Sequence, residues 1–212
     1  PVALTRVIAA DLASTPDLDP RAARALAVQH LAAAKAAGNA ALAEAFAARP
    51  TAARELIRAQ AVLTDGLVTT ALRIACDQLH PLANATESER IAVLAVGGYG
   101  RAEMAPHSDV DLLFLTPWKI TPWAESVIES MLYMLWDLKL KVGHASRTVK
   151  DCLRLGRDDI TIRTALLEHR FLAGHEPLAT ELGDRLWQEL FRNSGPEFIE
   201  AKLAERAARH KR

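Results

Sequence analysis

The chain has 212 residues and a mass of 23.1 kDa, enough for a buried core that needs no disulfide staples. Hydrophobic residues make up 50% and charged residues 25%, a balance that excludes a disordered chain. The 26 Lys and Arg residues equal the 26 Asp and Glu residues, so no overall charge draws the chain to nucleic acid or to an anionic membrane.

The first 80 residues predict helices, because they are rich in alanine and place apolar residues at helical spacing. Asp19 as an N-cap and Pro20 at the first helical position mark a helix start, and Gly38 marks its end. The expected helices cover residues 22–37, 40–48 and 51–79.

The pattern changes after residue 80 and predicts an α/β (α+β) fold, with a small mixed sheet flanked by helices on both sides. The expected strands cover residues 91–96, 110–115, 141–148 and 168–172. Helices are expected over residues 123–138, 151–167 and from 177 onward, with an interruption at 193–196. Three regions follow: a helical N-terminal region (1–82), a core (83–175) and a C-terminal helical segment (176–212).

The cysteines, the apolar runs and the chain ends bear on where the protein acts. Two cysteines far apart, Cys76 and Cys152, favour a reducing, cytoplasmic setting over a disulfide framework. No apolar run approaches the roughly 20 residues of a membrane-spanning helix, and no signal peptide is recognisable at the start. The missing initiator methionine and the charged final segment indicate a piece of a longer protein.

The first feature that carries chemistry is the pair Gly97-Gly98, which ends an expected buried strand and precedes a helix start. Glycines there let backbone N–H groups approach a polyphosphate, and the helix N-terminus adds a favourable dipole. On its own such a pair is more often a plain turn. It matches neither the P-loop nor the dinucleotide-binding fingerprint.

The second feature is Asp109-Val110-Asp111 at the start of the next strand. Because side chains alternate along a strand, Asp109 and Asp111 project from one face. Two carboxylates this close repel each other unless a cation lies between them, and Mg²⁺ takes carboxylate and phosphate oxygens. An Asp-x-Asp pair alone is usually a solvated strand end. In the order strand, Gly-Gly, short helix, Ser-Asp-x-Asp and strand, the combination predicts a metal–nucleotide site.

The run Gly-Gly-Tyr-Gly-Arg-x-Glu, followed by Pro-x-Ser-Asp-x-Asp-Leu-Leu, resembles the motif of the DNA polymerase β-like nucleotidyltransferase superfamily. More closely, the chain is similar to the N-terminal catalytic domain of the bacterial uridylyltransferase/uridylyl-removing enzymes that modify P-II nitrogen signal proteins. Segments 140–148, 167–174 and 201–206 support this closer resemblance, which spans about residues 85–212.

The resemblance implies Mg²⁺-dependent transfer of UMP from UTP to a tyrosine of a P-II protein, with pyrophosphate released. Neither a membrane nor a nucleic acid is an expected partner. By position, the catalytic, metal-binding carboxylates are Asp109 and Asp111. The nucleotide-binding residues are Gly97, Gly98, Tyr99, Arg101 and Ser108. For two of them a structural role is an open alternative: an ion pair with Glu103 for Arg101, and packing of the turn for Tyr99.

The sequence departs from the superfamily pattern at the third carboxylate, which many members carry on a later strand. The expected strand 141–148 offers only His144 and Arg147 there. Glu168 could serve instead, or form an ion pair with Arg170. His144 could contact substrate or be a hydrogen-bonded structural residue.

Two further functions stay open at this point. Nothing in the motif distinguishes uracil from adenine, so a related transferase with another nucleotide or acceptor is one alternative. A binding module that holds nucleotide or a signal protein without turnover is the other, favoured by the missing third carboxylate. Residues 1–212 offer at most the transferase half of the family enzyme, without its hydrolase and glutamine-sensing domains.

Overall fold

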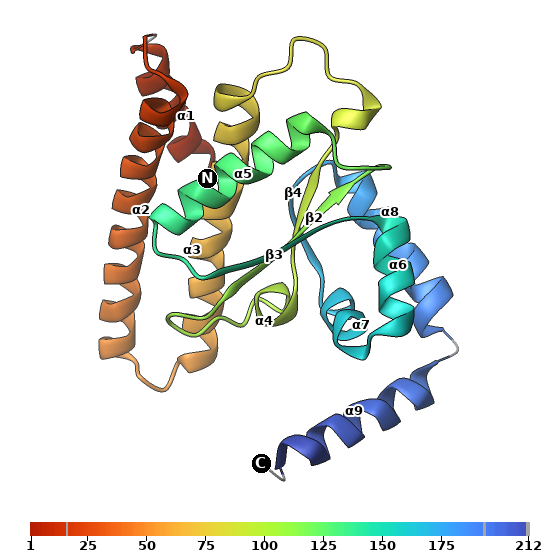
Figure 1. Cartoon of the computed structure of the whole chain (residues 1–212). Helices are drawn as coiled ribbons and strands as arrows, with labels where there is room; N and C mark the ends of the chain where they lie inside the picture. Colours follow the sequence, from red (N-terminus) through yellow and green to blue (C-terminus); the bar gives the residue numbers. More distant parts are fainter. Residues whose placement is uncertain (16, 193, 211–212) are drawn as a thin grey trace.

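The computed structural model describes residues 1–15, 17–192 and 194–210 (Figure 1). Its N-terminal part is helical, as expected. The helices are α1 (Val2–Ala13), α2 (Pro20–Ala48) and α3 (Ala53–Ile74), which continues into the π-helical turn η1 (Ala75–Leu79). The Asp19 carboxylate accepts a hydrogen bond from the Ala22 N–H at 2.7 Å and so caps α2 as its sequence predicts.

We expect Asp19→Ala to lower the free energy of unfolding by about 1 kcal/mol, because it removes this cap. Urea unfolding followed by circular dichroism measures the change. Asp17→Ala is the matched control, since Asp17 makes no hydrogen bond or ion pair within the described part of the chain. Equal unfolding midpoints for the two variants would show that the cap does not stabilise the fold.

The expected helix end at Gly38 was wrong, because α2 continues through this residue. The missing side chain of glycine lets α2 and α3 pack closely at this position. A Cβ at Gly38 would lie 2.5 Å from the Leu63 Cδ1 atom on α3. A tertiary contact therefore outweighs the roughly 1 kcal/mol by which glycine disfavours a helix interior.

A mixed four-stranded sheet follows, in the order β3-β2-β1-β4. Its strands are β1 (Ala92–Ala95), β2 (Val110–Thr116), β3 (Val142–Thr148) and β4 (Arg170–Gly174), which confirms the expected strands to within two residues at each end. Strand β1 is antiparallel to β2 and β4, whereas β2 and β3 are parallel. The parallel pair is joined by a crossover helix, α5 (Pro122–Asp137), as a parallel connection requires.

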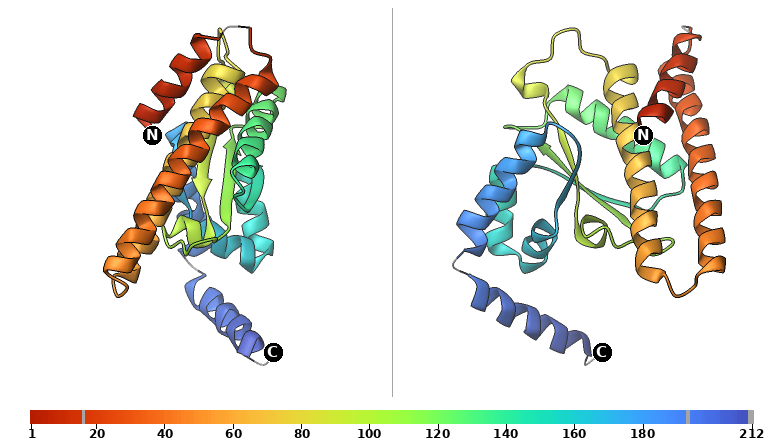
Figure 2. Two further views of the ribbon diagram at one scale, coloured as in Figure 1. Left: turned by 90° about the vertical axis from the view of Figure 1, so that its left-hand side faces the viewer. Right: turned by 180° about the vertical axis from the view of Figure 1, so that it is seen from behind.

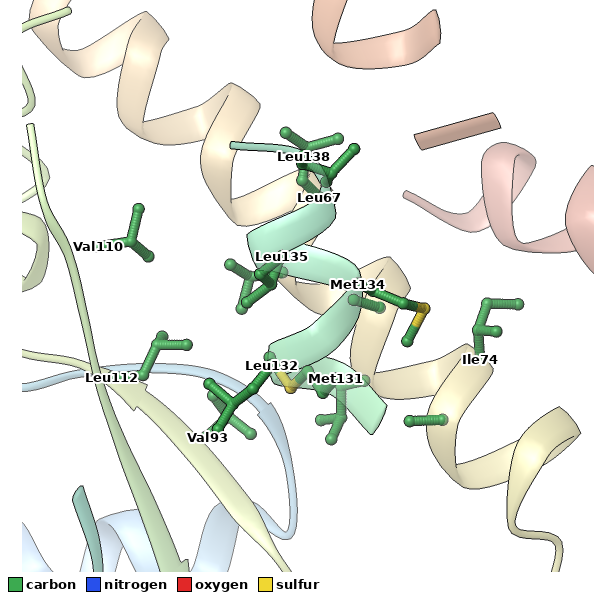
Figure 3. Packing of buried hydrophobic residues seen from close by; sticks show 14 of the residues in the cluster. Leu67, Ile74, Val93, Val110, Leu112, Met131, Leu132, Met134, Leu135 and Leu138 are labelled. Atoms are coloured by element: carbon green, nitrogen blue, oxygen red, sulfur yellow. The ribbon is translucent and has the colours of Figure 1, made fainter. Parts of the chain in front are cut away.

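Helices cover both faces of the sheet, which confirms the expected fold class (Figures 1 and 2). Helices α3 and α5 cover one face, with α1 and α2 packed against them, while α6 (Val149–Asp158) and α8 (Glu176–Leu186) cover the other. The first face buries a continuous apolar core (Figure 3). Its labelled members are Leu67, Ile74, Val93, Val110, Leu112, Met131, Leu132, Met134, Leu135 and Leu138.

The expected single helix over residues 151–167 was also wrong. The chain forms α6 and then α7 (Ile160–Leu167), with Asp159 in an extended conformation between them. The Asp159 carboxylate accepts hydrogen bonds from the N–H groups of Thr161 and Ile162, at 2.7 and 3.0 Å. These bonds lower the pKa of Asp159 and start a new helix in a new direction.

The remaining elements are short connections and the C-terminal helices. They are the one-turn helix α4 (Gly97–Gly100), the 3-10 turn η2 (Glu87–Glu89), the π-helical turn η3 (Trp187–Phe191) and α9 (Gly195–His210). Of the expected interruption at 193–196, residue 193 lies outside the described residues, and α9 begins at Gly195. Helix α9 extends away from the rest of the chain (Figures 1 and 2). Among the described helices, none has both the length and the apolar character needed to cross a membrane.

Candidate nucleotide-binding site

A glycine turn lies at the end of the central strand β1, where α4 makes a single helical turn. Gly97 has a φ of +61°, in the left-handed region that favours glycine. The first N–H groups of a helix have no intrahelical acceptor, so those of Gly97 and Gly98 can bind an external anion. The turn thus has the backbone geometry that the sequence predicted for it.

Two carboxylates lie next to this turn. Asp109 is exposed directly before β2, and Asp111 is half-buried within it. Burial and the negative charge of Asp109 both raise the pKa of Asp111 above its ordinary value. The fold therefore brings the negative charge of Asp109 close to the half-buried Asp111 carboxylate, as expected for a cation site.

Asp111 is held in a cradle between two glycines. A Cβ at Gly97 would lie 3.4 Å from Asp111 Oδ2, and a Cβ at Gly143 would lie only 2.4 Å from Asp111 Oδ1. Gly143 is the residue of β3 that pairs with Asp111 in the parallel ladder. The carboxylate oxygens of Asp109 and Asp111 are the hard donors that Mg²⁺ prefers, so these residues fit that ion.

Gly143 is a site residue that the sequence reasoning did not assign. A signal for it was present, because an isolated glycine inside a strand often marks a close approach by another group. Which group approaches depends on the register of β3 against β2, and that register is a tertiary property.

Tyr99 does not extend into the site, so a nucleotide contact by its side chain was the wrong alternative. Its side chain is 1% exposed and belongs to the core, and burial is the main cause that raises the pKa of its phenol. The Arg170 guanidinium lies over its ring, 5.5 Å from the ring centre. Packing of the turn, the other alternative, is the role that the structure supports.

Arg101 is exposed at the rim of the glycine turn and is held by two carboxylates. Its Nε donates to Glu103 Oε2 at 3.1 Å, and its Nη1 forms an ion pair with Glu168 Oε1 at 2.6 Å. Its guanidinium also borders Gly98, where an added Cβ would come within 3.7 Å of Nη2. The expected ion pair with Glu103 is confirmed. A phosphate contact from Arg101 stays a prediction that this position allows.

Glu168 does not serve as a third metal ligand in this arrangement, because its carboxylate binds Arg101. The expected alternative, an ion pair with Arg170, was wrong as well, since Arg170 pairs with Asp65. Within the described ranges, no group of three or more His, Cys, Asp or Glu side chains is arranged to hold a metal ion. The site rests on two carboxylates.

His144 lies on the sheet face opposite Asp111. It pairs in the ladder with Leu112, and its ring makes edge contacts with Phe114 and Trp136, at 6.5 and 6.4 Å between ring centres. Phe114 and Leu112 face the α5 core, and His144 is exposed beside them on the edge strand β3. Both roles expected for His144 stay predictions. Ser108 is half-exposed beside Asp109, and its assistance in nucleotide binding stays a prediction.

Comparison with known proteins agrees with the class of protein that the motif predicts. Residues 38–138, which include the glycine turn and both aspartates, match the family described as "Putative nucleotidyltransferase DUF294". The nucleotidyltransferase class predicted from the motif is thereby confirmed.

Over nearly its whole length the chain is a homologue of the N-terminal region of bifunctional uridylyltransferase/uridylyl-removing enzymes. It is 77% identical over 210 residues to the enzyme of that name from Cereibacter sphaeroides, covering 99% of this chain and 23% of the relative. Its identity to the enzyme of that name from Ruegeria pomeroyi is 71% over 176 residues, covering 83% of this chain and 19% of the relative. The corresponding enzyme from Erythrobacter litoralis is 53% identical over 164 residues, or 77% of this chain and 18% of the relative. The chain thus spans less than a quarter of these relatives.

Proposed function

We propose that this chain is the transferase part of an enzyme that transfers UMP from UTP to a tyrosine of a P-II nitrogen regulatory protein, with release of pyrophosphate. The observation that carries the proposal is the Asp111 carboxylate, held against the glycine turn by Gly97 and Gly143. The names of the relatives support uridylyl transfer as the reaction. The P-II acceptor, its tyrosine and Mg²⁺ rest on the resemblance of the motif.

In this proposal Asp109 and Asp111 hold Mg²⁺. When bound, the ion neutralises the triphosphate and polarises its α-phosphate. Burial and the negative charge of Asp109 raise the pKa of Asp111, and a carboxylate so disfavoured in its ionised form supports a cation at this position. We also propose a cytoplasmic location, which the two unpaired cysteines Cys76 and Cys152 support.

The residues of the chain bind and orient the nucleotide. The N–H groups of Gly97 and Gly98 receive phosphate oxygens, and the Arg101 guanidinium lies close enough to the turn to add a cation. The phenolic oxygen of the acceptor tyrosine attacks the α-phosphorus and releases its proton to solvent, while the bond between that phosphorus and the pyrophosphate oxygen breaks. The turn and Arg101 also stabilise charge on the departing pyrophosphate.

Calorimetric titration of the purified chain with UTP, ATP, CTP and GTP, each with and without Mg²⁺, tests the first half of the proposal. We expect Mg²⁺-dependent binding with UTP preferred. Equal or stronger binding of another nucleotide would favour a transferase of different specificity. Absence of binding by any nucleotide would contradict the assignment of the site.

Incubation with a P-II protein and labelled UTP tests the second half. We expect Mg²⁺-dependent incorporation of label into a tyrosine of the P-II protein. Nucleotide binding without incorporation, when a full-length relative labels the same P-II protein under the same conditions, would favour the alternative of a binding module without turnover.

A further inference from the structure

One guanidinium, that of Arg170, joins three parts of the fold that are distant in sequence. Arg170 begins β4, and its Nη1 and Nη2 bind the Asp65 carboxylate on α3 at 2.8 and 3.1 Å. The same side chain donates from Nε to the Gly100 carbonyl at 3.2 Å and from Nη2 to the Tyr99 carbonyl at 3.1 Å. The glycine turn is thereby tied to α3 and β4.

This contact suits arginine and no other side chain. A planar fork of five donors serves a bidentate carboxylate and two carbonyls at once, whereas a lysine ammonium has three donors around a single atom. Both partners are largely shielded, since the side chains of Arg170 and Asp65 are 30% and 26% exposed. The ring of Tyr99 packs under the guanidinium and excludes water from one side.

The hydrogen bonds made by Arg170 restrict the orientation of the N–H groups of Gly97 and Gly98, because rigid peptide planes connect the two. The carbonyls that Arg170 holds share their peptide planes with the N–H groups of Gly100 and Arg101. Those N–H groups donate to the carbonyls of Val96 and Gly97, at 3.0 and 3.1 Å. These carbonyls in turn share their planes with the N–H groups of Gly97 and Gly98.

A one-turn helix needs such external support. Helix formation begins with an unfavourable nucleus, and α4 has only four residues to offset it. Besides Arg170, the turn is supported by the Glu168 backbone, which packs so closely that a Cβ at Gly100 would lie 1.9 Å from the Glu168 oxygen. The cation also lies at the carbonyl end of the turn, where a positive charge is favourable.

We propose that Arg170, fixed by Asp65, is a positioning residue that orients the N–H groups of Gly97 and Gly98 toward the phosphates of a nucleoside triphosphate. Arg170 acts through the turn and does not itself touch the nucleotide. The inference rests on the proposed function for the identity of the ligand. The orientation of the turn is a property of the chain without nucleotide and can be measured separately.

The test uses Arg170→Lys, which keeps the positive charge, and Asp65→Asn, which keeps the shape of the side chain. Arg185→Lys is the matched control, because Arg185 binds Glu181 and Glu189 on α8 and η3, away from the turn. Nitrogen-15 NMR spectra without nucleotide report the amides of Gly97, Gly98 and Gly100. We expect these amides to shift in both test variants and to stay unchanged in the control. We also expect Mg²⁺-dependent affinity for UTP to fall about tenfold in the test variants.

A merely structural role for Arg170 would lower the thermal unfolding midpoint without moving the glycine amides of the folded protein, and that result would overturn the inference. Unchanged UTP affinity in a variant with shifted amides would overturn it as well. If the unmodified chain binds no nucleotide, the proposed function fails. The amide shifts then decide alone whether Arg170 orients the turn.

Discussion

Asp111→Asn is expected to weaken Mg²⁺-dependent binding of UTP and, at the same time, to stabilise the metal-free chain at neutral pH. The loss of binding should be on the order of 100-fold, because one of two charged ligands is lost and a bound metal contributes several kcal/mol to charge stabilisation. The amide keeps the shape of the side chain, so the cradle formed by Gly97 and Gly143 stays filled.

The gain in stability follows from the direction of the pKa shift. Burial and the charge of Asp109 raise the pKa of Asp111 in the folded chain, so the folded state holds this proton more tightly than the unfolded state. Stability of the metal-free chain therefore falls as the pH rises through the interval between the unfolded and folded pKa values. Above that interval the ionised Asp111 lowers the free energy of unfolding. The neutral asparagine does not carry this charge, so the variant is more stable.

Calorimetric titration with Mg²⁺ and UTP, together with thermal unfolding at acidic and neutral pH, measures both effects. Asp184→Asn is the matched control, since Asp184 is an exposed acid on α8, outside the site. Unchanged binding in Asp111→Asn would show that Asp111 is no metal ligand. A variant less stable than the original chain at neutral pH would contradict the cost assigned to its charge.

Gly143→Ala is expected to weaken Mg²⁺-dependent binding of UTP on the order of 100-fold while leaving the fold intact, because small displacements of a binding group have large effects. Its Cβ would lie 2.4 Å from Asp111 Oδ1, so the Asp111 carboxylate must move out of its cradle. That atom is the end of a side chain that can rotate. The change in the free energy of unfolding should therefore stay within about 1 kcal/mol.

Gly100→Ala provides the contrast, because its Cβ would meet backbone 1.9 Å away, at the Glu168 oxygen. Backbone cannot rotate aside, so we expect a loss of about 3 kcal/mol in the free energy of unfolding. Gly195→Ala is the control, since its added Cβ would meet no atom within 4 Å from the described residues beyond its own chain neighbours and helix backbone. Urea unfolding and calorimetry on all three variants make the comparison. Unchanged nucleotide binding by Gly143→Ala would contradict the claim that Gly143 holds the Asp111 carboxylate in place for binding.

Local sequence patterns predicted the elements of the sheet and the main features of the site. The β-branched run before Gly97-Gly98 forms β1, and Val110 to Leu115 form most of β2, because an apolar run of strand length bounded by turn residues has few other solutions. The predicted aspartates lie at the start of β2, next to the predicted glycine turn, since only a short segment separates them in the chain.

At Gly38 and Tyr99 a contact between distant residues overrides a local signal, whereas at Asp159 the sequence reasoning missed a local helix cap. Gly38 signals a helix end, yet the side chain of Leu63 makes it a point of close helix packing. Residues 160–167 continue the helical pattern of the preceding segment, but the Asp159 carboxylate starts a separate helix over them. Tyr99 follows the glycines in a polar segment and is nevertheless buried against Arg170.

The sequence alone determined the class of chemistry: two acidic side chains and a glycine pair at strand ends, in an order that predicts a metal–nucleotide site. These features lie within the single segment 97–111, so the short connection between two adjacent strands brings them together. Only the tertiary structure placed Gly143 against Asp111 and tied Asp65 to Arg170, which are 105 residues apart. Such contacts depend on strand register and on helix packing, which short-range patterns do not encode.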